Sequence, residues 1–334
     1  MALLDIEGLT VRFRTLRGEV HAVNGVTLSV DEGETVALVG ESGSGKSVTA
    51  LAVLGLLAPT ATIAAGSIRS AGRELVGLPG AKMREVRGRA ISMVFQDPMT
   101  SLNPLMTIGA QIREVLDAHT DLRGRAAKQR VVELIEQVGI PDAERRSFQY
   151  PHQFSGGMRQ RAMIAVAIAC KPRLLIADEP TTALDVTMQA QILGLLASLI
   201  AEYRMGLLLI THDLGVVAGT CETTNVMYGG RIVETGTTRE IFRSPTHPYT
   251  RGLLGSIPTM GGERKVKLTA IDGQPPVLRS TPQGCTFEAR CANRIERCVV
   301  EVPSLDPVGD DTGSMVHAAA CFNPWPSARD GGVA

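Results

Sequence analysis

Residues 40–47 read Gly40-Glu41-Ser42-Gly43-Ser44-Gly45-Lys46-Ser47, and they join an apolar run of strand type to a segment of helical type. The octapeptide matches G-x-x-x-x-G-K-S/T in the strand-to-helix context that this motif requires. Its glycines allow backbone N–H groups to converge on phosphate oxygens at the N-terminus of a helix. We therefore predict that residues 40–47 and Val48 bind a nucleotide, with Lys46 on the β- and γ-phosphates and Ser47 on Mg²⁺.

An acidic pair ends a second apolar strand, which reads Leu174-Leu175-Ile176-Ala177-Asp178-Glu179. Open parallel sheets place their ligand chemistry at the carboxyl ends of their strands. We predict that Asp178 holds Mg²⁺ through water and that Glu179 activates the attacking water as a general base. The alternative is a pair of solvated loop acids, which the phosphate motif upstream makes less favourable.

A third motif, Ser155-Gly156-Gly157-Met158-Arg159-Gln160-Arg161, lies between the first two. It opens a predicted helix, whose positive end can meet a γ-phosphate. Taken alone, it would be an ordinary serine N-cap followed by glycines. The order of the three motifs favours the phosphate role for Ser155, Gly156, Gly157 and Met158.

Strands and helices alternate along the chain, which predicts an α/β sheet. Two N-terminal runs, 3–13 and 21–30, alternate in hydrophobicity and are predicted to pair as an antiparallel β subdomain. Helical periodicity between residues 109 and 139 predicts a helical subdomain, which we place at about 97–158. A capping box at Thr237 predicts another helix after the last strand.

Composition changes near residue 261, where prolines and cysteines become frequent. We therefore predict one nucleotide-binding domain at 1–260 and a small, loop-rich appendage at 261–334. Cys285, Cys291, Cys298 and Cys321 crowd this appendage, with five, six and 22 residues between them. In a reducing compartment, such a group indicates a metal site rather than disulfides. By residue chemistry alone, iron–sulfur and zinc fit equally well, and metal-free thiols are a third possibility.

The remaining residues exclude several classes of protein. The 34 basic residues balance the 34 acidic ones, so there is no charge excess for nucleic-acid binding. No apolar run reaches the roughly 18 residues that span a bilayer, so we expect no membrane helix. The segment 1–7 lacks the basic start of a signal peptide, and we expect a cytoplasmic protein. His317 is a further candidate metal ligand, although we expect an exposed loop histidine.

The three motifs, together with Gln96, the triplet Ala183-Leu184-Asp185 and His212, resemble the ATP-binding subunit of an ABC transporter, in the same order. The resemblance covers residues 1 to about 235. It implies that Phe13 stacks on adenine, that Gln96 senses Mg²⁺ and the nucleophile, and that His212 contacts the γ-phosphate. It also implies that the triplet bridges a dimer of ATPase chains. The signature here reads Phe154 to Met158, where the family usually begins with Leu and ends with Gln.

A narrower resemblance, to the D-type ATPase of dipeptide and oligopeptide importers, covers nearly the whole chain. It rests on stretches that include Phe95 to Pro104, Tyr150 to Gln153 and His247 to Thr250. It implies that the four C-terminal cysteines hold a 4Fe-4S cluster. The implied partners are a second, homologous ATPase subunit, two membrane permease subunits and an extracytoplasmic peptide-binding protein, with no nucleic acid. The implied location is the cytoplasmic face of the cell membrane.

Other functions stay open from the sequence. The same type of ATPase serves nickel and glutathione importers, and the cysteine appendage favours the peptide branch. A soluble ABC ATPase that acts on nucleic acid or the ribosome usually has two cassettes or a basic arm, and neither is present. A nucleotide-binding module without turnover is disfavoured because Glu179 and His212 are both present.

Overall fold

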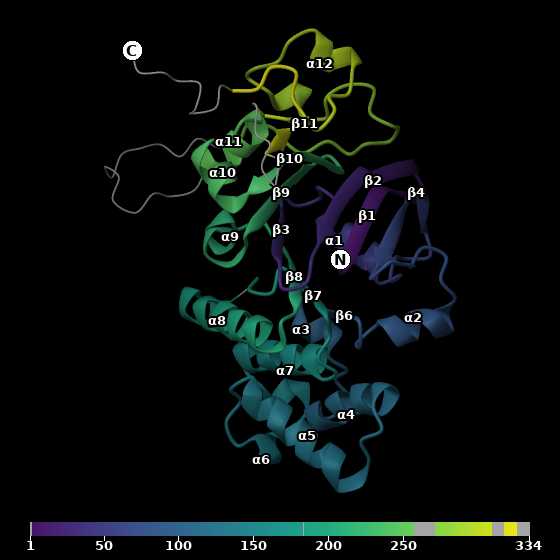
Figure 1. Cartoon of the computed structure of the whole chain (residues 1–334), viewed down its shortest axis with the longest axis vertical. Helices are drawn as coiled ribbons and strands as arrows, with labels where there is room; N and C mark the ends of the chain where they lie inside the picture. Colours follow the sequence, from purple (N-terminus) through teal and green to yellow (C-terminus); the bar gives the residue numbers. More distant parts are fainter. Residues whose placement is uncertain (1, 183, 257–270, 309–316, 326–334) are drawn as a thin grey trace. The chain divides into compact units, whose positions relative to one another are not determined.

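The computed structural model describes residues 2–182, 184–256, 271–308 and 317–325 (Figure 1). The chain forms two compact units. Unit 1 consists of Met1–Leu4, Val30–Glu34 and Ser70–Leu209. Unit 2 consists of Asp5–Ser29, Thr35–Arg69 and Ile210–Ala334. The predicted boundary between residues 260 and 261 and the predicted site residue Ala183 lie outside the described residues.

The sheet strands of unit 1 are β6 (Ile91–Val94), β7 (Leu174–Asp178) and the first four residues of β8 (Gly206–Thr211). They are neighbours in the order β8-β7-β6, and β6 and β7 run parallel. Every residue of these three strands is buried. Such continuous apolar runs are typical of parallel strands that are covered on both faces. The strand predicted before Asp178 is thereby confirmed.

Helices make up most of the rest of unit 1. They are α2 (Gly80–Val86), α3 (Pro98–Ser101), α4 (Ile108–His119), α5 (Gly124–Gln137), α6 (Ala143–Ser147), η1 (Pro151–Gln153), α7 (Gly156–Ile168) and α8 (Val186–Tyr203). The apolar faces of α4, α5 and α6 pack against one another and α7 packs on them, which confirms a helical subdomain. The predicted helical stretch 109–139 is two helices, and Gly124, with a φ of 55°, begins the second. The short β5 (Arg73–Glu74) completes the unit.

Unit 2 contains two groups of strands. In the first, the order is β2 (Gly18–Val30), β1 (Leu4–Thr15), β4 (Ala61–Ser70). In the second, it is β11 (Asp306–Pro307), β12 (Ala318–Ala319), β10 (Arg231–Thr237), β9 (Thr223–Tyr228), β3 (Thr35–Val39). β3 and β9 are parallel, whereas β9, β10, β12 and β11 are antiparallel to their neighbours. The cysteine-bearing extension therefore adds two short strands to the edge of β10.

The helices of unit 2 are α1 (Lys46–Val53), α9 (Leu214–Thr220), α10 (Thr238–Arg243), α11 (Pro248–Gly255), η2 (Glu288–Arg290) and α12 (Arg297–Val300). The capping box that predicted α10 is present, since Thr237 accepts from the Glu240 N–H and Glu240 accepts from Thr237. β4 and α2 were not predicted. β4 has a single buried residue, and its exposed and half-buried residues do not alternate regularly, so it lacks the pattern that marks a half-buried strand.

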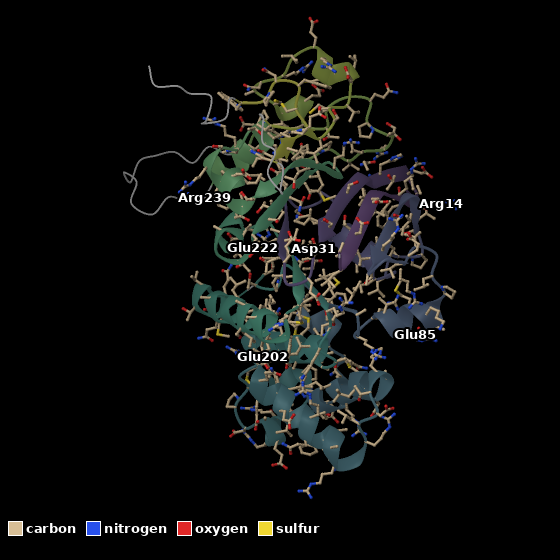
Figure 2. The ribbon with its side chains drawn as sticks, in the orientation of Figure 1. Arg14, Asp31, Glu85, Glu202, Glu222 and Arg239 are labelled. Atoms are coloured by element: carbon tan, nitrogen blue, oxygen red, sulfur yellow. The ribbon has the colours of Figure 1, made fainter. Side chains whose placement is uncertain are left out.

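One helix among the described residues, α8, is long enough and apolar enough to cross a membrane by length and composition. This differs from the sequence-based expectation of no such segment. A single helix of this kind is weak evidence, because a helix packed against a protein core passes the same test. Ile192, Leu196 and Leu199 of α8 are buried in that way. The charged residues labelled in Figure 2, among them Glu202 at the end of α8, are exposed.

Candidate functional site

The phosphate loop of unit 2 runs from the end of β3 into α1, as the motif predicts. Two of its glycines are required by their surroundings. A Cβ added to Gly40 would overlap the carbonyl of Met227, and one added to Gly45, which has a φ of 108°, would lie 2.5 Å from the carbonyl oxygen of Ala22. The loop backbone is therefore held tightly between neighbouring segments, as close approach to a phosphate requires.

Lys46 lies under this loop rather than in solvent, with only 4% of the residue exposed. Its Nζ donates to the carbonyl oxygens of Gly40 at 2.8 Å and Glu41 at 2.9 Å. The N-cap of α1 is Gly45, which offers no side chain to the N–H groups of the first turn. The Lys46 ammonium group and the N-terminal N–H groups of α1 thus lie at the same loop, and both kinds of group bind phosphate.

Two further residues predicted for the nucleotide also lie on unit 2. Phe13 is half-buried on β1. His212 is exposed directly after β8, where the next residue, Asp213, caps α9. Their roles in nucleotide binding stay predictions.

In unit 1, the structure brings Gln96 and Glu179 together. The Gln96 amide Nε2 donates to Glu179 Oε2 at 3.0 Å, and the Thr182 hydroxyl donates to the same oxygen at 2.9 Å. Asp178 is buried at the end of β7. Glu179 has a φ of 46°, a left-handed conformation that costs a residue with a side chain on the order of 1–3 kcal/mol. This strain turns the carboxylate at the strand end toward Gln96 and Thr182.

Unit 1 also carries the signature. Ser155 caps α7 by accepting from the Met158 N–H at 3.3 Å, and Ser155 and Gly156 are exposed. Gly157 is buried, and a Cβ there would overlap the end of the Met188 side chain. At the start of α8, Asp185 accepts from the Met188 N–H at 2.9 Å, next to half-buried Leu184. The predicted helix start is confirmed, whereas the action of these residues on a second chain stays a prediction.

The thiols of the extension gather on unit 2. The four are Cys285, Cys291, Cys298 and Cys321. The Cys285 N–H donates to the Cys298 carbonyl at 2.8 Å. Burial raises the pKa of Cys285 to about 11, the N–H of Phe287 lowers it, and the nearby Cys298 and Cys291 raise it. Burial likewise raises the pKa of Cys321 to about 11, and the other three thiols are close enough to add to this. Nevertheless, within the described ranges no three His, Cys, Asp or Glu side chains are arranged to hold a metal ion.

Burial settles one other sequence expectation, that for His317, and also indicates the role of Cys221. His317 is 6% exposed, and its Nε2 lies 2.8 Å from Glu234 Oε1, so the expectation of an exposed loop histidine is wrong. No sequence pattern indicated this partner, which is 83 residues away. Cys221 is buried, and burial raises the pKa of its thiol to about 12, which agrees with a packing role.

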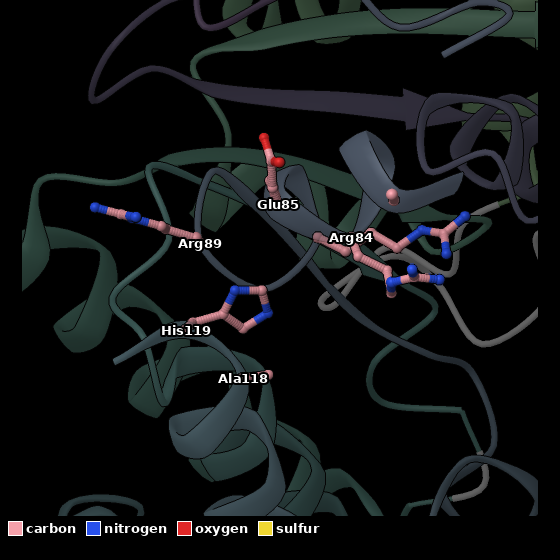
Figure 3. Close-up of a pocket in the computed structure, with 7 residues that line it drawn as sticks. Arg84, Glu85, Arg89, Ala118 and His119 are labelled. Carbon is pink, nitrogen blue, oxygen red and sulfur yellow. The ribbon is translucent and has the colours of Figure 1, made fainter. Parts of the chain in front are cut away.

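Two cavities are formed by described residues of unit 1. One, of about 230 Å³, is formed by α4, α5 and α6 and the residues that follow, and its rim includes Phe148, which is 71% exposed. The other, of about 410 Å³, is lined largely by cationic side chains. Figure 3 shows Arg84, Arg89 and His119 of this second cavity, with Glu85. Burial and the nearby Arg89 lower the pKa of His119.

Comparisons with known proteins agree with this geometry. Residues 23–182 match the family described as ABC transporter, and residues 233–298 match the family described as oligopeptide/dipeptide transporter, C-terminal region. The chain is 54% identical over 323 residues to a putative peptide import ATP-binding protein of Brucella ovis, covering 93% of this chain and 96% of that protein. It is 52% identical over 309 residues to the oligopeptide transport ATP-binding protein OppD of Bacillus subtilis, covering 92% and 86%.

Solved structures show the same fold. A dimeric ATP-binding cassette in a post-hydrolysis state, bound to ADP and Pi, aligns with a TM-score of 0.63 at 26% identity. The alignment covers 71% of this chain and 99% of that one.

Proposed function

This chain belongs to the ATP-binding proteins of oligopeptide and dipeptide ABC transporters, and we propose that it is the ATP-hydrolysing subunit that drives uptake of peptides. The observation that carries the proposal is the hydrogen bond from Gln96 to Glu179 beside buried Asp178. A chain that has Gln96, Asp178 and Glu179 together with a closely packed phosphate loop has the residues needed to hydrolyse ATP as well as to bind it.

In the proposed reaction, Glu179 accepts a proton from the attacking water, and Gln96 orients its carboxylate. Lys46 and the N-terminus of α1 stabilise the charge on the transferred phosphoryl group. His212 contacts the same group. Hydroxyl, amide and carboxylate oxygens are ligands of the type that Mg²⁺ prefers, and the proposed ligands Ser47, Gln96 and Asp178 are of these types. When bound, Mg²⁺ neutralises charge on the β- and γ-phosphates.

The proposed working form is a pair of ATPase chains, in which the second chain is homologous rather than identical. Ser155 and Gly156 are exposed at the start of a 13-residue helix, so their N–H groups can reach a γ-phosphate on another molecule. The loop that includes Leu184 and Asp185 would bridge the pair. ATP then closes the dimer, and its hydrolysis opens the dimer again.

The pair is proposed to act on two membrane permease subunits and an extracytoplasmic peptide-binding protein, from the cytoplasmic face of the membrane. The cavity that includes Phe148 offers a place for a permease helix, because an exposed aromatic at the rim of an apolar groove is typical of a binding surface. This cavity lies in the helical subdomain, within the same unit as Gln96. Movement of the helices could thus be coupled to the catalytic carboxylate.

We also propose that the four cysteines of the extension bind a 4Fe-4S cluster. In support, the thiols are close enough to perturb one another, and backbone N–H groups hydrogen-bond to three of them. Such hydrogen bonds to sulfur tune the potential of iron–sulfur centres. Anaerobically purified protein should show the brown iron–sulfur absorbance and contain iron and sulfide. A colourless protein with one zinc ion, or with four free thiols, would contradict the cluster.

The transported solute is tested in the assembled transporter. With permeases and binding protein reconstituted in vesicles, we expect ATPase activity to rise when the binding protein carries a peptide. Nickel and glutathione are the comparison solutes, and stimulation by either instead of peptides would reject the proposal.

The Glu179→Gln variant should lose ATP turnover, while Glu202→Gln, on an exposed helix end, retains it. Full turnover in Glu179→Gln would reject the assigned base. Nucleic acid is not expected to stimulate the enzyme.

A further inference from the structure

Arg290 of the cysteine-bearing extension contacts the phosphate loop. Its guanidinium forms a two-pronged ion pair with Glu41, the second residue of the loop motif. Arg290 Nη1 lies 2.7 Å from Glu41 Oε2, and Arg290 Nη2 lies 3.1 Å from Glu41 Oε1. The Arg290 side chain is only 7% exposed, and that of Glu41 is 23% exposed. Paired bonds of this kind fix orientation as well as charge.

Every N–H of the Arg290 guanidinium has an acceptor. Besides the two bonds to Glu41, Nε donates to the Asp272 carbonyl at 2.8 Å, and Nη2 donates to the Ile271 carbonyl at 3.1 Å. Nη1 also donates to the Tyr228 hydroxyl at 3.2 Å. Because an arginine has five such donors, this side chain is fully satisfied in one position. The arrangement is therefore a specific contact rather than a chance surface pair.

Glu41 is held through its backbone as well. Its N–H donates to the Tyr249 hydroxyl at 2.8 Å, and its carbonyl accepts from Lys46 Nζ. The ring of Phe287, three residues before Arg290, packs against the rings of Tyr228 and Tyr249 at centroid distances of 5.1 and 5.3 Å. One short turn of the extension thus supplies both the aromatic anchor and the ion pair.

The charge of this pair matters because Glu41 adjoins a site for a polyanion. An unneutralised carboxylate there would repel a bound triphosphate, and a loop that must first be ordered would bind it more weakly. We propose that Arg290 is a positioning residue of the ATP site, which neutralises Glu41 and fixes the phosphate loop, so that nucleotide affinity depends on the cysteine-bearing extension. This inference rests on the proposed ATPase function.

The same turn links the loop to the thiols. Cys285 and Cys291 flank it, and within it the Arg290 N–H donates to the Phe287 carbonyl at 3.0 Å. The next N–H, that of Cys291, donates to the Glu288 carbonyl at 3.2 Å. Arg290 can therefore keep its place only if the backbone between the two cysteines keeps its shape. The state of these thiols should influence ATP affinity through Arg290.

Equilibrium binding of a fluorescent ATP analogue with Mg²⁺ to the full chain tests the proposal. We expect Arg290→Gln to raise the Kd on the order of tenfold, the value of a charge-assisted hydrogen-bonded pair. Arg290→Lys, which keeps the charge without the fork, should lie between it and the unchanged protein. The control is Arg297→Gln, which removes an exposed pair with Glu301 on the same extension and should leave Kd unchanged. In the reconstituted transporter, Arg290→Gln should raise KM for ATP with kcat little changed.

The double variant Arg290→Gln with Glu41→Gln separates neutralisation from general damage. Removing the carboxylate should restore much of the affinity that Arg290→Gln loses, whereas a merely unstable extension would gain nothing. A Kd for Arg290→Gln equal to that of the control, or no recovery in the double variant, would overturn the proposal. If Arg290→Gln does not fold, the same comparison is made with Arg290→Lys. Failure of the unchanged chain to bind ATP would instead reject the proposed function.

The link to the thiols has its own comparison. Cys291→Ala should weaken nucleotide binding in the unchanged chain, and should weaken it no further when Arg290→Gln is already present. If the factors by which the two substitutions raise the Kd multiply in the combined variant, Cys291 does not act through Arg290. The readout is nucleotide affinity, so the comparison does not depend on transport activity.

Discussion

Replacement of the buried carboxylate Glu234 by glutamine should destabilise the protein strongly. Glu234 is completely buried on β10. Its Oε1 accepts from the Thr246 N–H at 2.8 Å and from the Thr246 hydroxyl at 2.9 Å, and it lies 2.8 Å from His317 Nε2. Its Oε2 accepts from the His247 N–H at 3.1 Å. Since a carboxylate only accepts, it can satisfy all four donors, and Nε2 of His317 must carry the proton.

Glutamine has one accepting oxygen and one donating NH₂ group. In its better orientation, the oxygen serves Thr246 and His317, while the NH₂ faces the N–H of His247. That N–H then lacks a partner, which costs about 1–3 kcal/mol, and the bonds that remain lose the strength that charge gave them. The sum is about 2–4 kcal/mol. For a chain of 334 residues, whose entropy of unfolding is on the order of 0.7 kcal/mol per kelvin, it corresponds to a decrease in Tm of about 3–6 °C.

The assay is thermal unfolding followed by circular dichroism at one fixed scan rate, at neutral pH. The matched control is Glu222→Gln, in which the carboxylate replaced is exposed (Figure 2), and it should change stability by no more than about 0.5 kcal/mol. If Glu234→Gln unfolds within about 2 °C of this control, the buried network does not contribute as argued.

Three further outcomes can be measured. Burial by itself would raise the pKa of Glu234, but the bonds from His317 and Thr246 lower it overall, below the ordinary 4.5. The contribution of the Glu234 carboxylate to stability is therefore complete above pH 4.5 and is lost as pH falls through the lowered pKa. The Tm difference between the wild type and Glu234→Gln should then shrink only below pH 4.5. A difference that shrinks between about pH 8 and 6 would contradict the lowered pKa. Gln96→Ala removes a hydrogen bond to a charged group and should lower kcat roughly tenfold or more in the ATPase assay, and an unchanged kcat would contradict it. Gly40→Ala should abolish ATP binding because the new Cβ would meet the Met227 carbonyl. Gly157→Ala should fold and bind ATP because the new Cβ would meet only the movable end of the Met188 side chain. Equal ATP binding by the two variants would refute this distinction.

The local parts of the site could be predicted from the sequence because each depends on neighbouring residues. The phosphate loop needs glycines beside a lysine, the strand before Asp178 needs an unbroken apolar run, and Ser155 needs only the helix that follows it. These patterns therefore predicted the strands and helices that carry the candidate site residues in both units. They could not show that Glu179 adopts a left-handed conformation, because its φ depends on contacts made after folding.

Contacts between distant residues could not be predicted in this way. Arg290 and Glu41 are 249 positions apart, and both are charged residues in segments that look solvated. His317 likewise lies among residues of loop type, and its burial depends on β12 pairing with β10, in which Ala319 is opposite Glu234. A two-residue strand has no periodicity to detect. Only the folded chain shows that these polar groups neutralise one another.

These distant pairs bear on what the extension is for. A small appendage attached only by its chain could be lost without effect on the ATPase. Here, the described residues of the extension supply Arg290 to Glu41 in the phosphate loop and His317 to Glu234 on β10. Both acidic partners belong to the nucleotide-binding part of unit 2, and one of them is completely buried. Without the extension, Glu234 would lose a charge-assisted partner and Glu41 would stand unneutralised beside a triphosphate. We therefore expect unit 2 to depend on the extension for stability through His317 and, as proposed above, for the charge balance of the phosphate loop through Arg290.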